Sequence, residues 1–321
     1  MHVIRDPADF PVLSNAVVTS GTFDGVHRGH QRILARLRQV ADAVGGPAVV
    51  ITYWPHPRLV LGPPLSHPEL LALQLLSTLD ERIAKLADYG VDYLLVMPFT
   101  RDFAEWTSEQ YIQELLLKTV HAEHLVIGYD HRFGKNREGG FDYLSQHAGR
   151  YGFTVEEIPR QDVDAVGVSS TRIRAALRGG DVATATRYLG YHYPLTGLVV
   201  TGQQLGRTIG YPTANLQVPE PLKLVPAQGI YAVWAVTAAG TRHPAMLSIG
   251  VRPTIGAGLA QTIEVNLLDF SGDLYGQLLT LEFVAWLRGE EKYDSLAALT
   301  TQLALDAEAT RAALGPSSQN T

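Results

Sequence analysis

The stretch GTFDGVHRGH, residues 21–30, decides the fold of the first half of the chain through what surrounds it. It follows the apolar segment NAVVTS (15–20), which predicts a β-strand. It runs into the amphipathic segment HQRILARLRQVADAV (30–44), which predicts a helix. Taken alone, the H-x-G-H element fits a solvated turn, a metal half-site or a nucleotide site.

The alternation of strand-like and helix-like segments continues to about residue 190. Further strands are predicted at 47–53, 92–97, 123–128 and 153–159, and helices at 77–90, 108–120, 141–152, 171–180 and 181–190. Thr78 and Glu81 are placed for a capping box, with Gly90 as the terminator of that helix. This rhythm predicts a parallel sheet covered by helices on both faces, with ligands beyond the carboxyl ends of the strands.

After Pro194 the rhythm changes. Strand-like segments lie at 196–202, 229–236, 261–270 and 277–287 without helices between them, and 295–314 predicts a terminal amphipathic helix. Around Glu264, apolar and polar residues alternate with a period of two. Consecutive strands of this kind favour an antiparallel barrel or sandwich.

The composition narrows the classes of protein. The chain has 321 residues, a net charge of −6 and no cysteine. An acidic balance argues against a large nucleic-acid footprint, and the absence of cysteine excludes disulfides and thiolate metal sites. The apolar runs are far shorter than the ~20 residues that span a bilayer. We therefore expect a cytoplasmic protein with no nucleic-acid and no membrane partner.

Phosphate chemistry is the best functional reading of the first motif. His27, Gly29 and His30 stand at a predicted helix start, where unpaired N–H groups and the helix dipole favour anions. Glycine lets the backbone approach a bulky ligand, and each imidazole adds a donor. A metal site is less favoured because no third ligand is evident.

A second stretch, VGVSSTRIRAAL, places Ser169, Ser170 and Thr171 at another helix start, followed by Arg172 and Arg174. Alone it reads equally well as an N-cap with solvated arginines. Together, H-x-G-H after the first strand and S-S-T-x-x-R near the end of the sheet form the two-part signature of adenylyltransferases. The K-M-S-K-S loop that closes the site of class I aminoacyl-tRNA synthetases is missing.

The second half carries GRTIGYPTANL at 206–216. Thr213 and Asn215 offer oxygen ligands suited to magnesium, which takes a few protein oxygens together with phosphates and water. A lone P-T-A-N would be an ordinary loop. Likewise, a strand glutamate such as Glu264 is more commonly a solvated residue on an outer face.

With these motifs in order from about residue 16 to 310, the sequence resembles the bifunctional prokaryotic riboflavin kinase/FMN adenylyltransferase family, also called FAD synthetase. The resemblance implies an α/β fold with a doubly wound parallel-sheet nucleotidylyltransferase domain at 1–190, including a helical connector from about 171. An antiparallel β-barrel kinase domain with a terminal helix would occupy 191–321. The kinase would convert riboflavin to FMN with ATP and Mg2+, and the first domain would transfer AMP from ATP to FMN, giving FAD and pyrophosphate.

The resemblance also implies roles for individual residues. His27 and His30 would contact the ATP phosphates, and Glu264 would be the base that takes the proton from the ribityl hydroxyl. ATP would also meet Gly21, Phe23, Gly29, Ser169, Ser170, Thr171 and Arg174 in the first domain and Gly206, Arg207, Gly210 and Pro212 in the second. Flavin would meet His56, Pro57, Asp130, Phe133, Arg137, Arg252, Asp269 and Arg288, and the metal Thr213 and Asn215.

The sequence departs from the family pattern at a few positions. His131 stands where the family usually has phenylalanine, Tyr53 and Trp54 precede the P-H-P element, and Tyr129 replaces a small or polar residue. These changes put the details of flavin stacking in doubt. Two alternatives stay open. In one, a single site is competent, with the kinase favoured and the first domain as a nucleotide-binding partner. In the other, the chain is a non-catalytic flavin- or nucleic-acid-binding protein. The oligomeric state is open as well.

Overall fold

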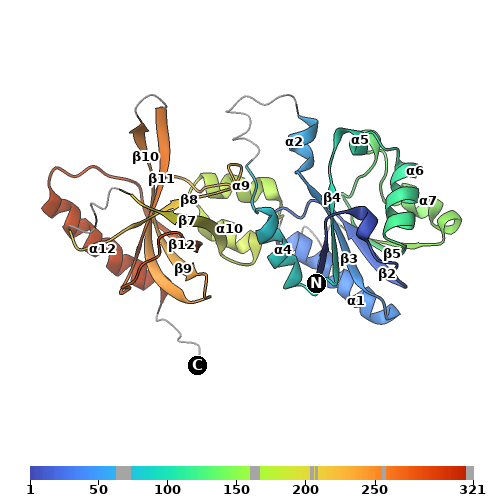
Figure 1. Ribbon diagram of the computed structural model, residues 1–321, viewed down its shortest axis with the longest axis horizontal. Helices are drawn as coiled ribbons and strands as arrows, with labels where there is room; N and C mark the ends of the chain where they lie inside the picture. The colour runs from blue at the N-terminus through green and yellow to red at the C-terminus, as the bar shows by residue number, and fades with distance from the viewer. Residues whose placement is uncertain (63–73, 160–166, 203–205, 207–208, 255–257, 316–321) are drawn as a thin grey trace. The chain divides into compact units, whose positions relative to one another are not determined.

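The computed structural model describes residues 1–62, 74–159, 167–202, 206, 209–254 and 258–315, and of residues 252–254 and 258–260 it describes the backbone alone. The chain forms two compact units, Met1–Ser170 and Thr171–Thr321 (Figure 1). Each unit has its own sheet.

The first unit is built on a six-stranded sheet in which every neighbouring pair is parallel. Its strands are β1 (His2–Ile4), β2 (Ala16–Ser20), β3 (Ala48–Trp54), β4 (Tyr93–Pro98), β5 (Ala122–Gly128) and β6 (Thr154–Ile158). Their order is β1-β4-β3-β2-β5-β6, so the winding direction reverses between β2 and β5. The predicted doubly wound parallel sheet is confirmed, and its switch point lies where ligands bind in such sheets.

Helices cover both faces of this sheet. Successive residues of a strand point to opposite faces, so Val17 packs with α1 (Arg28–Val44) and α4 (Leu79–Ala87) on one face. On the other face Val18 packs with helical residues from three further segments. These are α5 (Arg101–Ala104), η2 (Tyr111–Thr119) and α7 (Phe141–Tyr151).

Local sequence signals explain where several of these helices start. The Thr78–Glu81 capping box at the start of α4 is confirmed, with Glu81 N donating to Thr78 Oγ1 at 3.1 Å. The helix predicted at 108–120 differs from a regular α-helix. It begins as α6 (Ser108–Gln110) and widens into π-helical turns in η2. Such widened turns are frequent at functional sites, and the first residue of this one is Tyr111.

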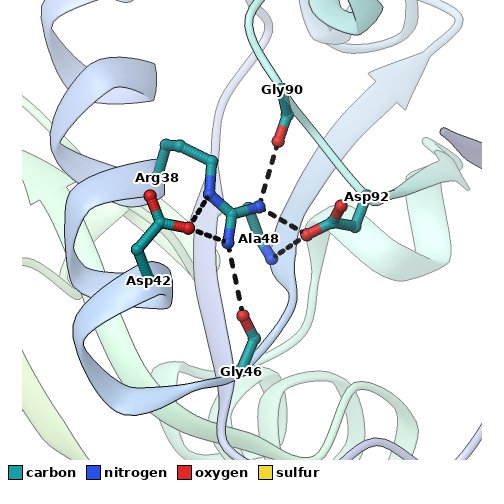
Figure 2. A network of polar contacts seen from close by, with 6 residues as sticks. All are labelled: Arg38, Asp42, Gly46, Ala48, Gly90 and Asp92. Carbon is teal, nitrogen blue, oxygen red and sulfur yellow. Dashed lines mark hydrogen bonds and ion pairs between the residues drawn. The ribbon is translucent and has the colours of Figure 1, made fainter.

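The amino-terminal edge of the sheet is tied together by Arg38 of α1 (Figure 2). Its Nη1 donates to Asp92 Oδ2 at 2.6 Å, and its Nε donates to Asp42 Oδ1 at 2.8 Å. Asp92 also accepts from Ala48 N, the first residue of β3, at 2.8 Å. The guanidinium therefore joins α1 to the starts of β3 and β4.

The second unit begins with α9 (Ser170–Arg178), whose first residue closes the first unit, and α10 (Val182–Leu189). A closed antiparallel barrel follows, in the order β10-β11-β8-β7-β12-β9. Its strands are β7 (Tyr193–Val200), β8 (Ala214–Gln217), β9 (Gly229–Thr237), β10 (Arg242–Thr254), β11 (Gly258–Leu267) and β12 (Leu278–Arg288). Because its strands form a closed barrel, the second unit is the first of the two predicted architectures, a barrel and not a sandwich.

The terminal helix α12 (Leu296–Leu314) lies where the sequence predicts it. Arg288 of β12 holds it with two hydrogen bonds to the buried carboxylate of Asp306, at 2.9 and 2.6 Å. A second link joins Arg311 to Asp269 at 3.0 Å. Both contacts fix α12 against the barrel.

Candidate active sites

The loop after β2 has an uncommon backbone. Phe23 and Val26 have positive φ angles of 48° and 33°, a region that costs a β-branched residue free energy. The buried carboxylate of Asp24 holds the loop in this shape, because it accepts from the backbone N–H groups of Leu76 and Ser77 at 3.0 Å each. Strain that is held in place by neighbouring structure is typical of ligand-binding loops.

The two histidines of the loop stand side by side at the start of α1. His27 is the N-cap, and its ring stacks on His30 with 3.7 Å between centroids. Gly29 between them is buried, Phe23 packs on His30 at 5.1 Å, and Gly21 N donates to Ile51 O at 3.0 Å. The arrangement leaves the helix N-terminus and both imidazoles in one place.

The pKa of His30 lies well below its ordinary value of 6.5. Burial is the largest cause, followed by the charges of His27 and Arg82. His30 is therefore neutral at neutral pH, and its Nδ1 is buried without a hydrogen-bond partner in the described part of the chain. A phosphate placed beside it would supply both a partner and the negative charge that favours protonation.

Arg82 is a residue that sequence reasoning missed. It is fully buried, and its Nη1 donates to Thr52 Oγ1 at 3.2 Å, while its guanidinium lies 5.6 Å from the Trp54 ring centroid. Burial lowers its pKa, and the charge of Asp24 opposes that effect. Among the described residues its Nε and Nη2 have no hydrogen-bond partner. An incompletely paired buried guanidinium is costly, which is the state expected of a residue that binds an anion.

A sequence signal for Arg82 did exist. It lies three residues after Leu79 and four before Leu86, both of which are buried on the inner face of α4. A charged residue at an inward position of an amphipathic helix is unusual and calls for a partner.

The second half of the adenylyltransferase signature meets this loop. Ser170, the first residue of α9, donates from Oγ to Asp24 O at 3.2 Å. Ser169 is half-buried, Thr171 is exposed and Arg174 is buried within α9. The structure thus joins the H-x-G-H loop to the S-S-T segment, although the two are far apart in sequence.

Aromatic side chains gather on the other face of the same sheet edge. The ring centroids of Phe133 and Tyr111 lie 4.6 Å apart. Phe133 is only 5% exposed, so its ring belongs to the buried core and not to the surface. Asp130 and Arg137 lie on the same loop with exposed side chains. His56 caps α2 (Pro57–Leu61), which follows β3.

The barrel brings Glu264 and Asn215 together. They are directly opposite each other in the antiparallel pairing of β11 with β8, so both side chains point to the same face. Ile263 and Val265 are buried on the other face, whereas Glu264 is half-buried. Thr213 immediately precedes β8.

Close backbone approaches shape this part of the barrel. A Cβ on Gly206 would lie 3.4 Å from Thr213 Oγ1, and a Cβ on Gly202 would collide with the Asn215 amide. Asn266, which sequence reasoning also missed, donates from Nδ2 to Pro212 O at 2.7 Å. Asn266 therefore positions the loop that leads into Thr213.

A cavity of about 400 Å3 adjoins Asn215. It is lined by Val200, Thr201, Asn215, Leu216, Gln217, Val218, Gln261, Thr262 and Ile263, so its polar lining consists of hydroxyl and amide groups. Hydroxyl, amide and carboxylate oxygens are ligands that a hard divalent cation takes, and Thr213, Asn215 and Glu264 carry one of each kind. Within the described residues no group of three or more His, Cys, Asp or Glu could hold a metal ion.

The remaining predicted residues are less informative. Arg288 and Asp269 are engaged by α12, as described above, and Gly210 is an exposed turn residue with φ of 81°. Arg207 and the side chain of Arg252 lie outside the described residues. A flavin or nucleotide role for these five residues stays a prediction.

Two protein-family models match successive parts of the chain. The FAD synthetase family model matches residues 10–172, and the riboflavin kinase family model matches residues 189–314. A bifunctional riboflavin kinase/FMN adenylyltransferase of Pseudomonas fluorescens is 40% identical over 96% of both chains. The Escherichia coli K12 protein of the same description is 37% identical over 90% of both chains.

A solved structure from Streptococcus pneumoniae, described as a macrolide-efflux protein, has the same fold. It matches with a TM-score of 0.86 and 33% identity, covering 96% of this chain and 98% of that chain. None of the helices in the described ranges of our chain has the length and apolar character needed to cross a membrane. The two family models and the full-length relatives show that the chain belongs to the bifunctional riboflavin kinase/FMN adenylyltransferase family, with the FAD synthetase domain first and the riboflavin kinase domain second.

Proposed function

We propose a specific division of roles among the residues of the two domains. In the first, ATP lies with its phosphates at the N-terminus of α1, against His27, Gly29 and His30. Arg82 adds fixed positive charge beneath them, and Ser170 holds the loop from the other side. The phosphate of FMN then attacks the α-phosphorus of ATP, which gives FAD and releases pyrophosphate.

This reaction needs no general base, because the attacking group is already an ionised phosphate. The protein has to align two anions and stabilise the charge of the transition state. His30 is half-buried and Arg82 is fully buried, and the lower local dielectric strengthens their electrostatic contacts. The unpartnered nitrogens of these two side chains support the assignment.

In the barrel domain, Glu264 accepts the proton from the ribityl hydroxyl of riboflavin. An alcohol is a poor nucleophile, so this step benefits from a base. Thr213 and Asn215 hold the divalent cation that kinases of this kind use, for which we propose Mg2+. That cation supplies charge neutralisation on the ATP phosphates, and Asn266 keeps Thr213 in place through Pro212.

The observation that carries the proposal is a contact in each unit between two motifs that are far apart in sequence. Ser170 contacts the loop that bears the H-x-G-H element, and Glu264 pairs with Asn215 across two strands. Both arrangements are local to one unit. We therefore assign two independent sites with riboflavin, FMN, FAD and ATP as ligands.

One assay tests this assignment. Purified protein is given riboflavin, ATP and Mg2+, and the flavin products are separated by chromatography. Wild type should make FMN and then FAD. Glu264→Gln should stop FMN formation while externally supplied FMN is still converted to FAD. Glu282→Gln is the matched control, because Glu282 is a barrel-strand glutamate paired with Arg242.

Three outcomes would contradict the proposal. FMN that is never adenylylated would leave only the kinase, and no turnover of either flavin would favour a binding protein. Loss of both activities in a folded Glu264→Gln variant would show that the two sites are coupled.

A further inference from the structure

A buried chain of hydroxyl groups connects three elements at the switch point of the parallel sheet. Tyr53 of β3 hydrogen-bonds Tyr111 of η2, with 2.8 Å between the hydroxyl oxygens. Tyr111 donates to Ser20 Oγ at 2.9 Å, and Ser20 Oγ lies 2.7 Å from His131 Nε2. Ser20 is the last residue of β2 and His131 lies just beyond β5, so this last contact bridges the two strands between which the winding reverses.

One set of hydrogen-bond directions in this chain defines a single tautomer of His131. Because Tyr111 gives its proton to Ser20, Tyr53 is left to donate to Tyr111. The proton of Ser20 is then available for His131, and we infer that Ser20 donates to His131 Nε2 across their 2.7 Å contact. A neutral imidazole that accepts at Nε2 carries its hydrogen on Nδ1.

His131 is also kept uncharged. Burial lowers its pKa to about 4, with smaller contributions from the charges of Arg132 and Arg137 on its own loop. The other titratable groups facing the network are the phenols of Tyr111 and Tyr53, whose pKa values burial raises. None of these groups changes charge between pH 5 and 8.5, on the ordinary values of tyrosine and arginine.

The Nδ1 atom of His131, which carries the hydrogen in this tautomer, has no hydrogen-bond partner among the described residues and is shielded from solvent. Buried donors are nearly always paired, so an orphan of this kind points to a ligand that completes it. The residue as a whole is only half-buried. The next residue, Arg132, has an exposed side chain whose Nη1 donates to the backbone carbonyl of His131 at 2.8 Å.

We propose that His131 donates a hydrogen bond from Nδ1 to an acceptor on the ring system of bound FMN, and that it selects for this flavin. The proposal rests on the adenylyltransferase function proposed above. Two observations favour the flavin ring over the phosphates of either substrate. His131 packs beside Phe133 at 5.7 Å, within the aromatic cluster on one face of the sheet. The histidines and Arg82 that suit phosphate lie with α1 and α4 on the other face.

The first test measures the tautomer directly. Two-dimensional 15N–1H NMR of the full-length protein at pH 7, without ligand, reports which ring nitrogen of His131 carries hydrogen. We expect the Nδ1–H form in wild type and mixed tautomers in Ser20→Ala. A pure Nε2–H form in wild type would overturn the proposal, whether or not the chain makes FAD.

The second test measures binding. His131→Phe removes the donor and keeps an aromatic ring, and it should weaken FMN binding about fivefold to tenfold. ATP binding and the FMN-forming activity should not change. The visible absorption bands of bound FMN should also shift between wild type and His131→Phe, because a hydrogen bond to the ring alters them. His124→Phe is the control, since His124 lies in the same loop-strand segment and hydrogen-bonds Thr154 at the opposite end of β5.

Other results would refute the proposal in distinct ways. Weaker ATP binding with unchanged FMN binding would place His131 against adenine. A loss in FMN binding that disappears above pH 7 would mean that a charged imidazolium contacts the FMN phosphate. If wild type bound no FMN in its first domain, the proposed adenylyltransferase function would fail, whereas the tautomer result would still stand.

Discussion

The two edges of the parallel sheet differ in how far their polar groups are paired. At the amino-terminal edge, Arg38 makes hydrogen bonds to two carboxylates and two carbonyls (Figure 2). At the carboxyl-terminal edge, Arg82, His30 and His131 each keep a buried nitrogen without a partner among the described residues. Satisfied groups stabilise the fold, and unsatisfied groups are in place for a ligand. The contrast separates structural from functional polar residues within one sheet.

The largest effect should come from His30→Ala. In the proposed site, the change removes a donor to the phosphates of ATP, and loss of one such group costs about 10² to 10³ in rate. FAD formation should fall by that factor and FMN formation should be unchanged, measured by chromatography of both products. A variant that is folded yet keeps full FAD formation would break the comparison, because the unsatisfied nitrogen would then have no function.

The free energy of unfolding should depend on pH because the folded chain buries His131 in its neutral form. The unfolded chain binds a proton on His131 near pH 6.5, whereas the folded chain binds it only near pH 4. The free energy of unfolding should therefore fall as the pH drops from 6.5, by about 3 kcal/mol for this group at pH 4, with no contribution above 6.5. Urea unfolding of wild type and His131→Phe should give curves that diverge over this window. Parallel curves would contradict the assigned burial.

Arg82→Met should give a smaller loss. The methionine fills much of the same space without a buried charge, so the free energy of unfolding should change little or rise. FAD formation should fall about tenfold to hundredfold, because fixed positive charge near the phosphates is lost. Thermal unfolding checks the predicted stability, and the chromatographic assay checks the predicted loss of FAD formation. Lower stability with normal activity would make Arg82 a structural residue.

Arg38→Met should lower stability and leave activity unchanged, the opposite of Arg82→Met, and its effect should be the smallest of the four. Its ion pairs are partly exposed, so the free energy of unfolding should fall by about 1–2 kcal/mol, as read from urea unfolding. Both activities should stay at the wild-type level. Reduced FAD formation at full folding would show that the amino-terminal edge also supports catalysis.

Much of the fold follows from periodicity. The strands at the centre of the first sheet lie where the sequence predicts them, and so does α4 with its Thr78 capping box. Three strands escape prediction for physical reasons. β1 and β8 are too short to show a period, and β10 contains Pro244 and Pro253, which demote a strand in sequence.

Site residues that belong to a sequence motif could be predicted. Site residues that meet their partners only through the fold could not. His30 and Glu264 belong to motifs, so their sequence neighbours mark them. Arg82, Asn266 and the Ser20–His131 contact have no such neighbours, because their partners are distant in the chain. Tertiary packing brings these groups together, and only buried contacts reveal them.

The pairing of Glu264 with Asn215 has a consequence for how this chain can change its length. Side chains alternate across a strand, so removing one residue inside β11 would turn every following side chain to the other face. A deletion before Glu264 would exchange its carboxylate for an apolar neighbour at the same point of the barrel. Single-residue insertions and deletions in β8 or β11 should therefore be tolerated only with a compensating bulge, whereas the loops between strands can vary in length.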